Sequence, residues 1–452
     1  MKFFFAPLLV LSLVCVWGSG SKVRSDDAPV SREEFEKLRG ELEALRRGEP
    51  SAMAQQGPAS EGDLPGGGSP VLGVGSGPGG SLYDKPFLRQ AGGIQTHVGG
   101  YFDVEFMDRE SRDHDFRLHR LVPFFVADLH ERVRFATEIE IEDGSTVEVE
   151  FAALDLLLFE ALNFRGGVIL DPLGRFNLYH DSPYYDLVDR PLVNQLVIPT
   201  TLREPGAGIF GVIPTGTLDL DVKYEAYLTS GFKGLSDDPA ADPAITRSAG
   251  LREARAHEPA FGTRHFGDNN NGFAGVGRVS FSPLLASELG VSAHHGTYDE
   301  SGENDLTIAA VDALFTIPQF EIGDLPVGPM EILGEGAYAA IERNTFARSE
   351  GVPDDFWGYY TQVNYHFLPE YFLPRGTRVT TALFPESIFT LVGQWNQVNL
   401  DGDRRYRWTV GLNFRPVEST VIKLDYQFNR GVARASETAD LDAFLVSLAS
   451  YF

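Results

Sequence analysis

The chain has 452 residues, of which 43% are hydrophobic and 48 are glycine, and its formal net charge is −26. This acidic balance argues against a nucleic-acid partner, because binding a phosphate backbone requires clustered Lys and Arg. The proportions suit either a soluble β-protein or a membrane barrel in which apolar and polar strand positions average out.

The first segment predicts an export signal. Lys2 precedes the apolar run 3–17, and small residues follow at 18–21, so the charged, hydrophobic and cleavage regions occur in the usual order. We therefore expect residues 1–20 to be a cleaved signal peptide. The single cysteine, Cys15, lies inside this segment, so the mature protein is expected to have no disulfide.

Residues 21–48 predict a short coiled-coil helix on the periplasmic side. Ser31 and Glu34 form a capping box, and apolar residues then repeat at three and four positions, as the seam of a coiled coil requires. These seam residues are Phe35, Leu38, Leu42 and Leu45. Two heptads are marginal alone, so the segment is either a frayed tether or one of three helices in a trimer. Residues 49–93 are rich in Pro, Gly and Ser, which is typical of a flexible linker.

From residue 94 to residue 452 the chain alternates between apolar and polar residues. Asp103 and Glu105, for example, flank Val104, and Asp143 with Gly144 predicts a tight turn between two such segments. About sixteen segments of this kind can be placed, which predicts an all-β, antiparallel transmembrane barrel. Two connections, 318–327 and 368–386, are long at the end where short turns are expected, so eighteen strands remain an alternative.

The last segment, 441–452, is expected to be the closing strand. Phe444, Val446, Leu448 and Phe452 fall on one face of an extended strand. A barrel in lipid needs its last strand to pair with its first, because lipid cannot satisfy a free edge. Phe452 is then the expected assembly signal for the barrel assembly machinery. The alternative is an ordinary edge strand.

The third outer connection, about 171–205, is a long loop for which no regular structure is expected, which is unusual unless it is functional. Its sequence and flanks resemble the constriction-loop region of outer-membrane porins of the phosphate-selective porin O and P type. The matching motifs are 166–167, 171–176, 189–193, 198–201 and 204–206, with the strand motifs 277–279, 282–283 and 290–292. The resemblance implies a trimeric barrel whose third loop folds inward and narrows the pore.

Charged residues on this loop and on predicted inner strand faces are the candidate pore-lining set. The loop supplies Arg175, His180, Asp181, Asp189 and Arg190, and the strands supply Arg117, Arg134, Arg165 and Arg278. Phosphate selectivity needs convergent Arg or Lys to replace the water around the anion. Carboxylates share these faces, however, so each arginine can instead pair across strands.

We therefore expect a water-filled channel for small hydrophilic solutes and ions. A phosphate-selective or anion-selective porin is the first alternative, and a surface adhesin or receptor barrel without transport is the second. The expected partners are outer-membrane lipid, further copies in a homotrimer, the assembly machinery and the solutes. The expected location is the outer membrane of a diderm bacterium.

Enzymatic activity is not expected. Ser292 and His294 share a strand face, but residues two apart always do. The chain has no glycine-rich phosphate cradle and no cysteine cluster, and 268–272 lacks the ligand spacing of an EF-hand. We therefore expect neither a cofactor nor a metal.

Overall fold

The computed structural model describes residues 89–90, 96–110, 114–215, 221–238, 241–255, 270, 272–284, 286–323, 325–374, 377–431 and 441–452. The expected signal peptide, the seam residues Phe35, Leu38, Leu42 and Leu45, and nearly all of the expected linker lie outside these residues. Within them, no helix has the length and apolar character needed to cross a membrane.

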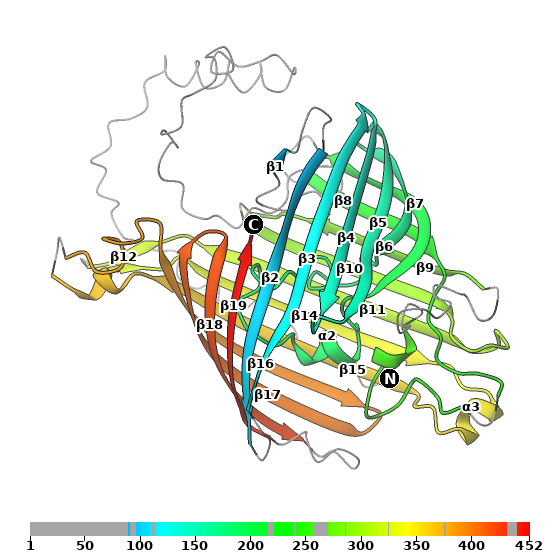
Figure 1. Cartoon of the computed structure of the whole chain (residues 1–452). Coiled ribbons are helices and arrows are strands. Elements are labelled where there is room, and N and C mark those ends of the chain that lie inside the picture. The colour runs from blue at the N-terminus through cyan, green and yellow to red at the C-terminus, as the bar shows by residue number, and fades with distance from the viewer. Residues whose placement is uncertain are drawn as a thin grey trace. The chain divides into compact units, whose positions relative to one another are not determined.

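Sixteen antiparallel strands form a closed barrel in the described part of the chain (Figure 1). They are β2 (Thr96–Arg109), β3 (Asp115–His130), β4 (Val133–Glu142), β5 (Thr146–Phe159), β6 (Leu162–Leu170), β7 (Arg203–Pro214), β8 (Asp221–Thr229), β9 (Ala274–Phe281), β10 (Ser287–Thr297), β11 (Asp305–Ile317), β14 (Met330–Ile341), β15 (Asp355–Phe367), β16 (Ile388–Leu400), β17 (Asp403–Val417), β18 (Thr420–Gly431) and β19 (Ala443–Tyr451). Each pairs with its neighbours in sequence order, and β19 pairs with β2. The predicted all-β barrel is confirmed.

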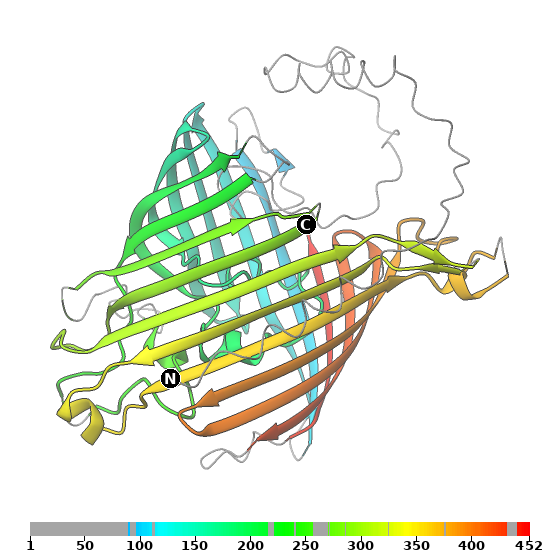
Figure 2. The ribbon, with the colours of Figure 1, turned by 180° about the vertical axis from the view of Figure 1, so that it is seen from behind.

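Seven shorter elements complete the described chain. They are β1 (Arg89–Gln90), the hairpin strands β12 (Phe320–Ile322) and β13 (Leu325–Val327), the helices α2 (Leu192–Leu196) and α3 (Thr345–Ser349), and the 3-10 helices η4 (Arg252–Ala254) and η5 (Pro369–Phe372). The connections 318–329 and 368–387 hold β12, β13 and η5, and the hairpin extends beyond the end of the barrel wall (Figure 2). Their length therefore comes from these additions, and the barrel closes with sixteen strands instead of eighteen.

The closing seam joins the two ends of the barrel sequence. β19 pairs with β2 from Ala443 opposite Arg109 to Tyr451 opposite Tyr101. Beyond the strand, the Phe452 N–H donates to the Gly100 carbonyl at 2.9 Å, and the Gly100 N–H donates back at 3.2 Å. The expected pairing of the last strand with the first is confirmed.

Alternation along the strands separates an apolar outer face from a polar inner face. On β18, Ile422, Leu424 and Tyr426 are exposed while Lys423 and Asp425 are buried. The same pattern places other large apolar side chains on the outside: Val104, Val279, Val291, Val311, Tyr338, Val363, Leu391, Trp408, Val410, Phe444 and Leu448. An outer surface of this composition suits contact with lipid.

Several charged side chains on the inner face are buried. Glu138, Glu150 and Asp155 have no exposed surface, although each stands on an inner strand position. The third loop, residues 171–202 between β6 and β7, covers Glu150, which lies 3.2 Å from both His180 and Thr201. Asp155 is instead paired with Arg165 of the neighbouring strand β6. The turn at Asp143 and Gly144 is confirmed, because both residues have positive φ, at 49° and 67°.

Candidate functional site

The third loop begins and ends on adjacent strands and is clamped at its base. Asn177 donates from its side-chain nitrogen to the carbonyls of Asp171 and Leu202, both at 2.8 Å, and its oxygen accepts from the Leu202 N–H at 2.8 Å. One buried amide thus joins both ends of a loop that starts one residue after β6 and stops one residue before β7. The expected boundary at 205 moves to 202 because β7 starts earlier.

The first half of the loop is held by β10 and β14. The Gly174 N–H donates to Ser292 Oγ at 2.8 Å, and the Phe176 N–H donates to Glu335 Oε2 at 2.9 Å. Arg175 lies with its guanidinium carbon 4.5 Å from the centre of the Tyr179 ring and donates to the Tyr184 hydroxyl at 3.0 Å. These contacts fix this half against the wall.

The middle of the loop crosses to β5, β18 and β19. His180 lies between the Asn177 carbonyl at 2.9 Å and Glu150 at 3.2 Å, and the Tyr451 hydroxyl donates to Asp181 at 2.9 Å. The Lys423 ammonium, buried in the wall, donates to the carbonyls of Ser182 and Leu187 at 2.7 and 3.0 Å. The loop therefore spans the barrel from its root to the far wall.

The last part of the loop packs into an apolar core with the fourth loop, residues 230–273 between β8 and β9. Leu192, Val193 and Leu196 of α2 belong to this core, together with Ile245 and Leu251 of the fourth loop. The Leu251 N–H donates to the Leu196 carbonyl at 2.9 Å. The expectation of a loop without regular structure is thus wrong over the single helical turn of α2.

Five side chains of the third loop keep partial exposure while all others in 171–202 are buried. They are Tyr179, Tyr184, Asp189, Arg190 and Gln195. Asp189 accepts from Gln427 at 2.9 Å and lies 3.7 Å from Arg407, and the Arg190 guanidinium donates to the Thr200 carbonyl. Of the charged loop residues expected in the pore, Asp189 and Arg190 are partly exposed, whereas Arg175, His180 and Asp181 are buried.

The four expected wall arginines each pair with a carboxylate. Arg165 forms two hydrogen bonds of 2.9 Å with Asp155. Arg278 lies 2.7 Å from Glu288 and also pairs with Asp312. Arg134 lies 2.6 Å from Asp128, and Arg117 lies 2.8 Å from Glu105. The cross-strand pairing that the sequence left open therefore holds for each of them.

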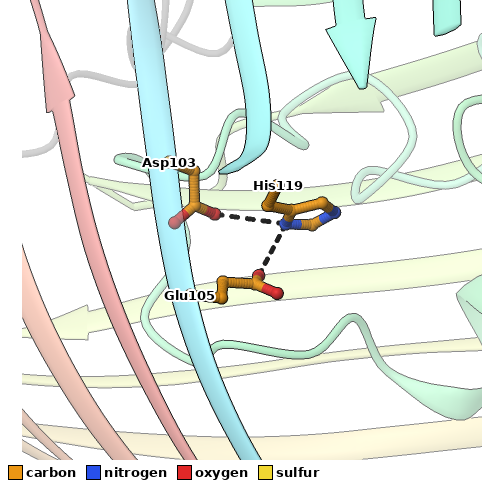
Figure 3. Close-up of side chains that lie close together, drawn as sticks. All are labelled: Asp103, Glu105 and His119. Atoms are coloured by element: carbon orange, nitrogen blue, oxygen red, sulfur yellow. Dashed lines mark hydrogen bonds and ion pairs between the residues drawn. The ribbon is translucent and has the colours of Figure 1, made fainter. Parts of the chain in front are cut away.

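A second group of charges joins β2 to β3 beside the Arg117 pair (Figure 3). His119 Nδ1 lies 2.5 Å from Glu105 and 3.4 Å from Asp103, and both carboxylates are buried. Arg120 lies 2.9 Å from the other ring nitrogen of His119 and 3.2 Å from Glu140. This group is a chain of polar contacts that runs from the two carboxylates through His119 and Arg120 to Glu140 along the inner wall.

Sequence reasoning missed several residues that hold the loop, notably Lys423, Asp425 and Glu335. Lys423 and Asp425 interrupt an apolar run at alternate positions on β18, so strand alternation alone identifies them as inward-facing. Their partners are backbone groups of the third loop, which strand alternation does not reveal. Ser292, weighed as a nucleophile beside His294, instead accepts from the Gly174 N–H.

Known proteins resemble the chain only in part. No protein-family model matches it. An uncharacterised protein of Aquifex aeolicus (strain VF5) is 31% identical over 221 residues, and the match spans 46% of each chain, so less than half of that relative is covered.

Solved structures with a similar arrangement are outer-membrane proteins. The outer membrane channel DcaP of Acinetobacter baumannii matches 81% of this chain and 99% of its own, with 10% identity and a TM-score of 0.49. OmpF of Salmonella typhi, solved with daunomycin, matches 80% of this chain and 98% of its own, with 10% identity and a TM-score of 0.48. An anion-selective porin from Comamonas acidovorans matches 79% of this chain and 99% of its own, with 10% identity and a TM-score of 0.46. Function is therefore argued from the residues of this chain.

Proposed function

We propose that the protein is an outer-membrane channel for passive diffusion of small hydrophilic solutes and ions. This proposal rests on the third loop, which leaves the wall after β6 and lies inside the closed barrel. Lys423 of the opposite wall donates hydrogen bonds to the loop backbone. A closed barrel satisfies all strand edges in lipid, and a tethered inner loop gives its lumen a fixed narrow section. The partly exposed Asp189 and Arg190 then face the permeating solutes.

General diffusion is favoured over phosphate selectivity by the pairing of the wall arginines. A phosphate site needs several cationic donors that are free to converge on the anion. Arg165 and Arg278 are instead buried against carboxylates, which hold their donors. The phosphate-selective porin O and P type remains the family that the loop motifs suggest, and it makes anion preference the first alternative.

A receptor or adhesin barrel without transport is the second alternative. It is favoured by the apolar core that joins the third and fourth loops to the inner wall of β8, β9, β11 and β14 to β16, because such a core fills part of the lumen. Conduction distinguishes this function from the proposed channel.

The test is electrical. Purified full-length protein, shown to be folded by a heat-modifiable gel shift, is added to a planar bilayer. We expect stepwise conductance, and a reversal potential in a salt gradient that reveals only weak ion preference. Folded protein that gives no steps supports the receptor, and strong block of chloride current by phosphate supports the anion-selective porin.

The proposed assembly is a homotrimer exported by a cleaved signal peptide, with the helix at 21–48 joining three copies. The support is the seam of Phe35, Leu38, Leu42 and Leu45. Replacing Leu38 and Leu42 by Asp is expected to reduce the chemically cross-linked trimer, whereas replacing the non-seam residues Glu36 and Arg39 by Ala leaves it unchanged. A trimer of equal yield in both variants contradicts the role of the helix.

A further inference from the structure

Asp171, Glu204 and His294 meet at the root of the third loop. Asp171 is the first residue of the loop, Glu204 stands at the start of β7 after the loop has ended, and His294 projects from β10. Their exposed fractions are 0%, 0% and 1%. One ligand atom from each lies within 4.8 Å of the other two, and His294 Nε2 is 3.6 Å from Glu204 Oε1.

Five of the six polar side-chain atoms of this group have no partner within hydrogen-bond distance. Both carboxylate oxygens of Asp171, Glu204 Oε1 and both ring nitrogens of His294 are buried without a donor or acceptor. The remaining oxygen, Glu204 Oε2, accepts from the Gly231 N–H at 3.1 Å. Buried polar groups in native proteins are almost always satisfied, so five unpartnered atoms converging in one place indicate a missing ligand.

The charge of the group indicates what that ligand is. Two carboxylates are buried together, and among the described residues no Lys or Arg forms an ion pair with either of them. In the Asp103, Glu105 and His119 group the neighbouring Arg117 and Arg120 supply positive charge. His294, 3.6 Å from Glu204, is the one described group beside them that can carry positive charge, and only when it is protonated. Burying two carboxylates with so little counter-charge is costly, so the missing ligand at the loop root is a cation.

We propose that Asp171, Glu204 and His294 bind one divalent metal ion of the zinc or manganese class. One imidazole with two carboxylates is a donor set that suits these ions, whereas calcium and magnesium prefer oxygen ligands alone. Ligands at about 2.1 Å from a tetrahedral ion lie about 3.4 Å apart, which is close to the 3.6 Å between His294 and Glu204. A small inward movement of Asp171 completes the set.

The ion has a structural role in this location. It connects the residue that begins the third loop to the second residue after its end, and it joins both to β10. The bond from Gly231 to Glu204 adds the start of the fourth loop. A metal here fixes the roots of both inward segments, whether or not the barrel conducts.

Metal content of the untagged full-length protein tests the site. The folded protein is stripped with EDTA, dialysed against Zn²⁺, freed of excess ion and measured by mass spectrometry. We expect about one Zn²⁺ per chain in the wild type and almost none in His294→Gln or Asp171→Asn. Loss of a ligand should weaken binding by more than the 10- to 100-fold typical of losing an outer-shell partner. His119→Gln, in the cation-rich group, is the matched control and should retain the ion.

Cobalt gives a second readout that does not depend on channel activity. Co²⁺ added to the stripped wild type should produce visible absorption bands of a bound ion, and these should be absent in His294→Gln. The heat-modifiable gel shift shows that each variant is folded. Stoichiometric binding lost with His294 supports the site. A wild type that binds no ion, or a folded His294→Gln that binds as much as the wild type, overturns it.

Discussion

At the residue scale, the inner face of this barrel is stabilised by charge pairs that other parts of the chain cover. Asp155 and Arg165 are an example, with side chains at most 2% exposed and two parallel hydrogen bonds. Removing one partner of such a pair leaves a buried charge uncompensated, which costs far more than the pair itself contributes. The pairing therefore affects the free energy of unfolding. It also determines how many guanidinium N–H donors remain available to solutes.

Arg165→Gln is expected to lower the free energy of unfolding by about 3–5 kcal/mol, because Asp155 then remains buried without its counter-charge. Unfolding in urea from lipid vesicles measures the change. The double variant Asp155→Asn with Arg165→Gln should recover much of the loss. A single variant as stable as the wild type contradicts the burial of this pair.

Asp189→Asn is expected to shift the ion preference of the channel toward anions, because it removes a partly exposed negative charge from the third loop. The ratio of cation to anion permeability should fall by about two- to fivefold. Reversal potentials in a salt gradient measure it. Glu253→Gln removes an exposed carboxylate of the fourth loop and serves as the control, and an equal effect in both variants places Asp189 away from the ion path.

At the element scale, two connections depend on a single side chain that accepts or donates several bonds. Asn177 joins the ends of the third loop, and Glu370 organises the connection between β15 and β16. Glu370 accepts from the Val379 and Thr381 N–H groups at 2.9 and 3.0 Å. In both cases one polar group joins parts of a long segment, so a single substitution tests that junction.

Asn177→Leu is expected to loosen the third loop while leaving the barrel closed. It removes three hydrogen bonds of 2.8 Å and exposes no new charge, so about 1–3 kcal/mol of stability should be lost. Single-channel recordings should show added current noise or substates. If the variant keeps the heat-modifiable gel shift and its single-channel currents equal those of the wild type, the Asn177 hydrogen bonds do not hold the third loop in place.

Glu370→Gln tests the connection between β15 and β16. Burial raises the pKa of Glu370, but hydrogen bonds from the Thr381 and Val379 N–H groups lower it by more than burial raises it. The resulting pKa is about 2. Because the folded pKa is depressed, this stabilisation is full above the unfolded value of about 4.3 and is lost as the pH falls through about 2. Hydrogen exchange at Val379 and Thr381 should speed up in the variant at neutral pH, while exchange at Tyr371 should not.

At the scale of the whole barrel, closure depends on the seam between β19 and β2. Phe452 exchanges two backbone hydrogen bonds with Gly100, and a side chain at Gly100 would collide with the Phe452 ring, 2.5 Å from the position of its first carbon. The glycine and the aromatic ring are thus complementary. Together they complete the pairing where the first and last strands meet.

Phe452→Ala is expected to reduce the fraction of protein that reaches the heat-modifiable, folded form in the outer membrane, because it removes the ring that covers Gly100. Quantitative gels of membrane fractions measure this fraction. Phe444→Ala, on the same outer face of the same strand, is the control. An equal loss in both variants means that general hydrophobicity, and not the position of Phe452, governs assembly.

The sequence by itself determined the barrel. Strand alternation is local and has a period of two, so residues such as Ile422, Lys423 and Leu424 reveal their faces without any knowledge of their neighbours. The same pattern placed the closing strand and the arginines of the inner wall. The predicted count of about sixteen strands is confirmed; the long connection 368–386 left eighteen open because a chain of that length can hold either a strand pair or, as here, a bonded turn.

Only the tertiary structure decided what fills the barrel. The bonds from Lys423 to Ser182, and the meeting of Asp171 with His294, join residues more than 100 positions apart. No local pattern encodes such contacts, because they depend on the path that the third loop takes through the lumen. That path covers the wall carboxylate of Glu150, separates the partly exposed Asp189 and Arg190 from their buried neighbours, and brings Asp171 close to Glu204 and His294 at the proposed metal site.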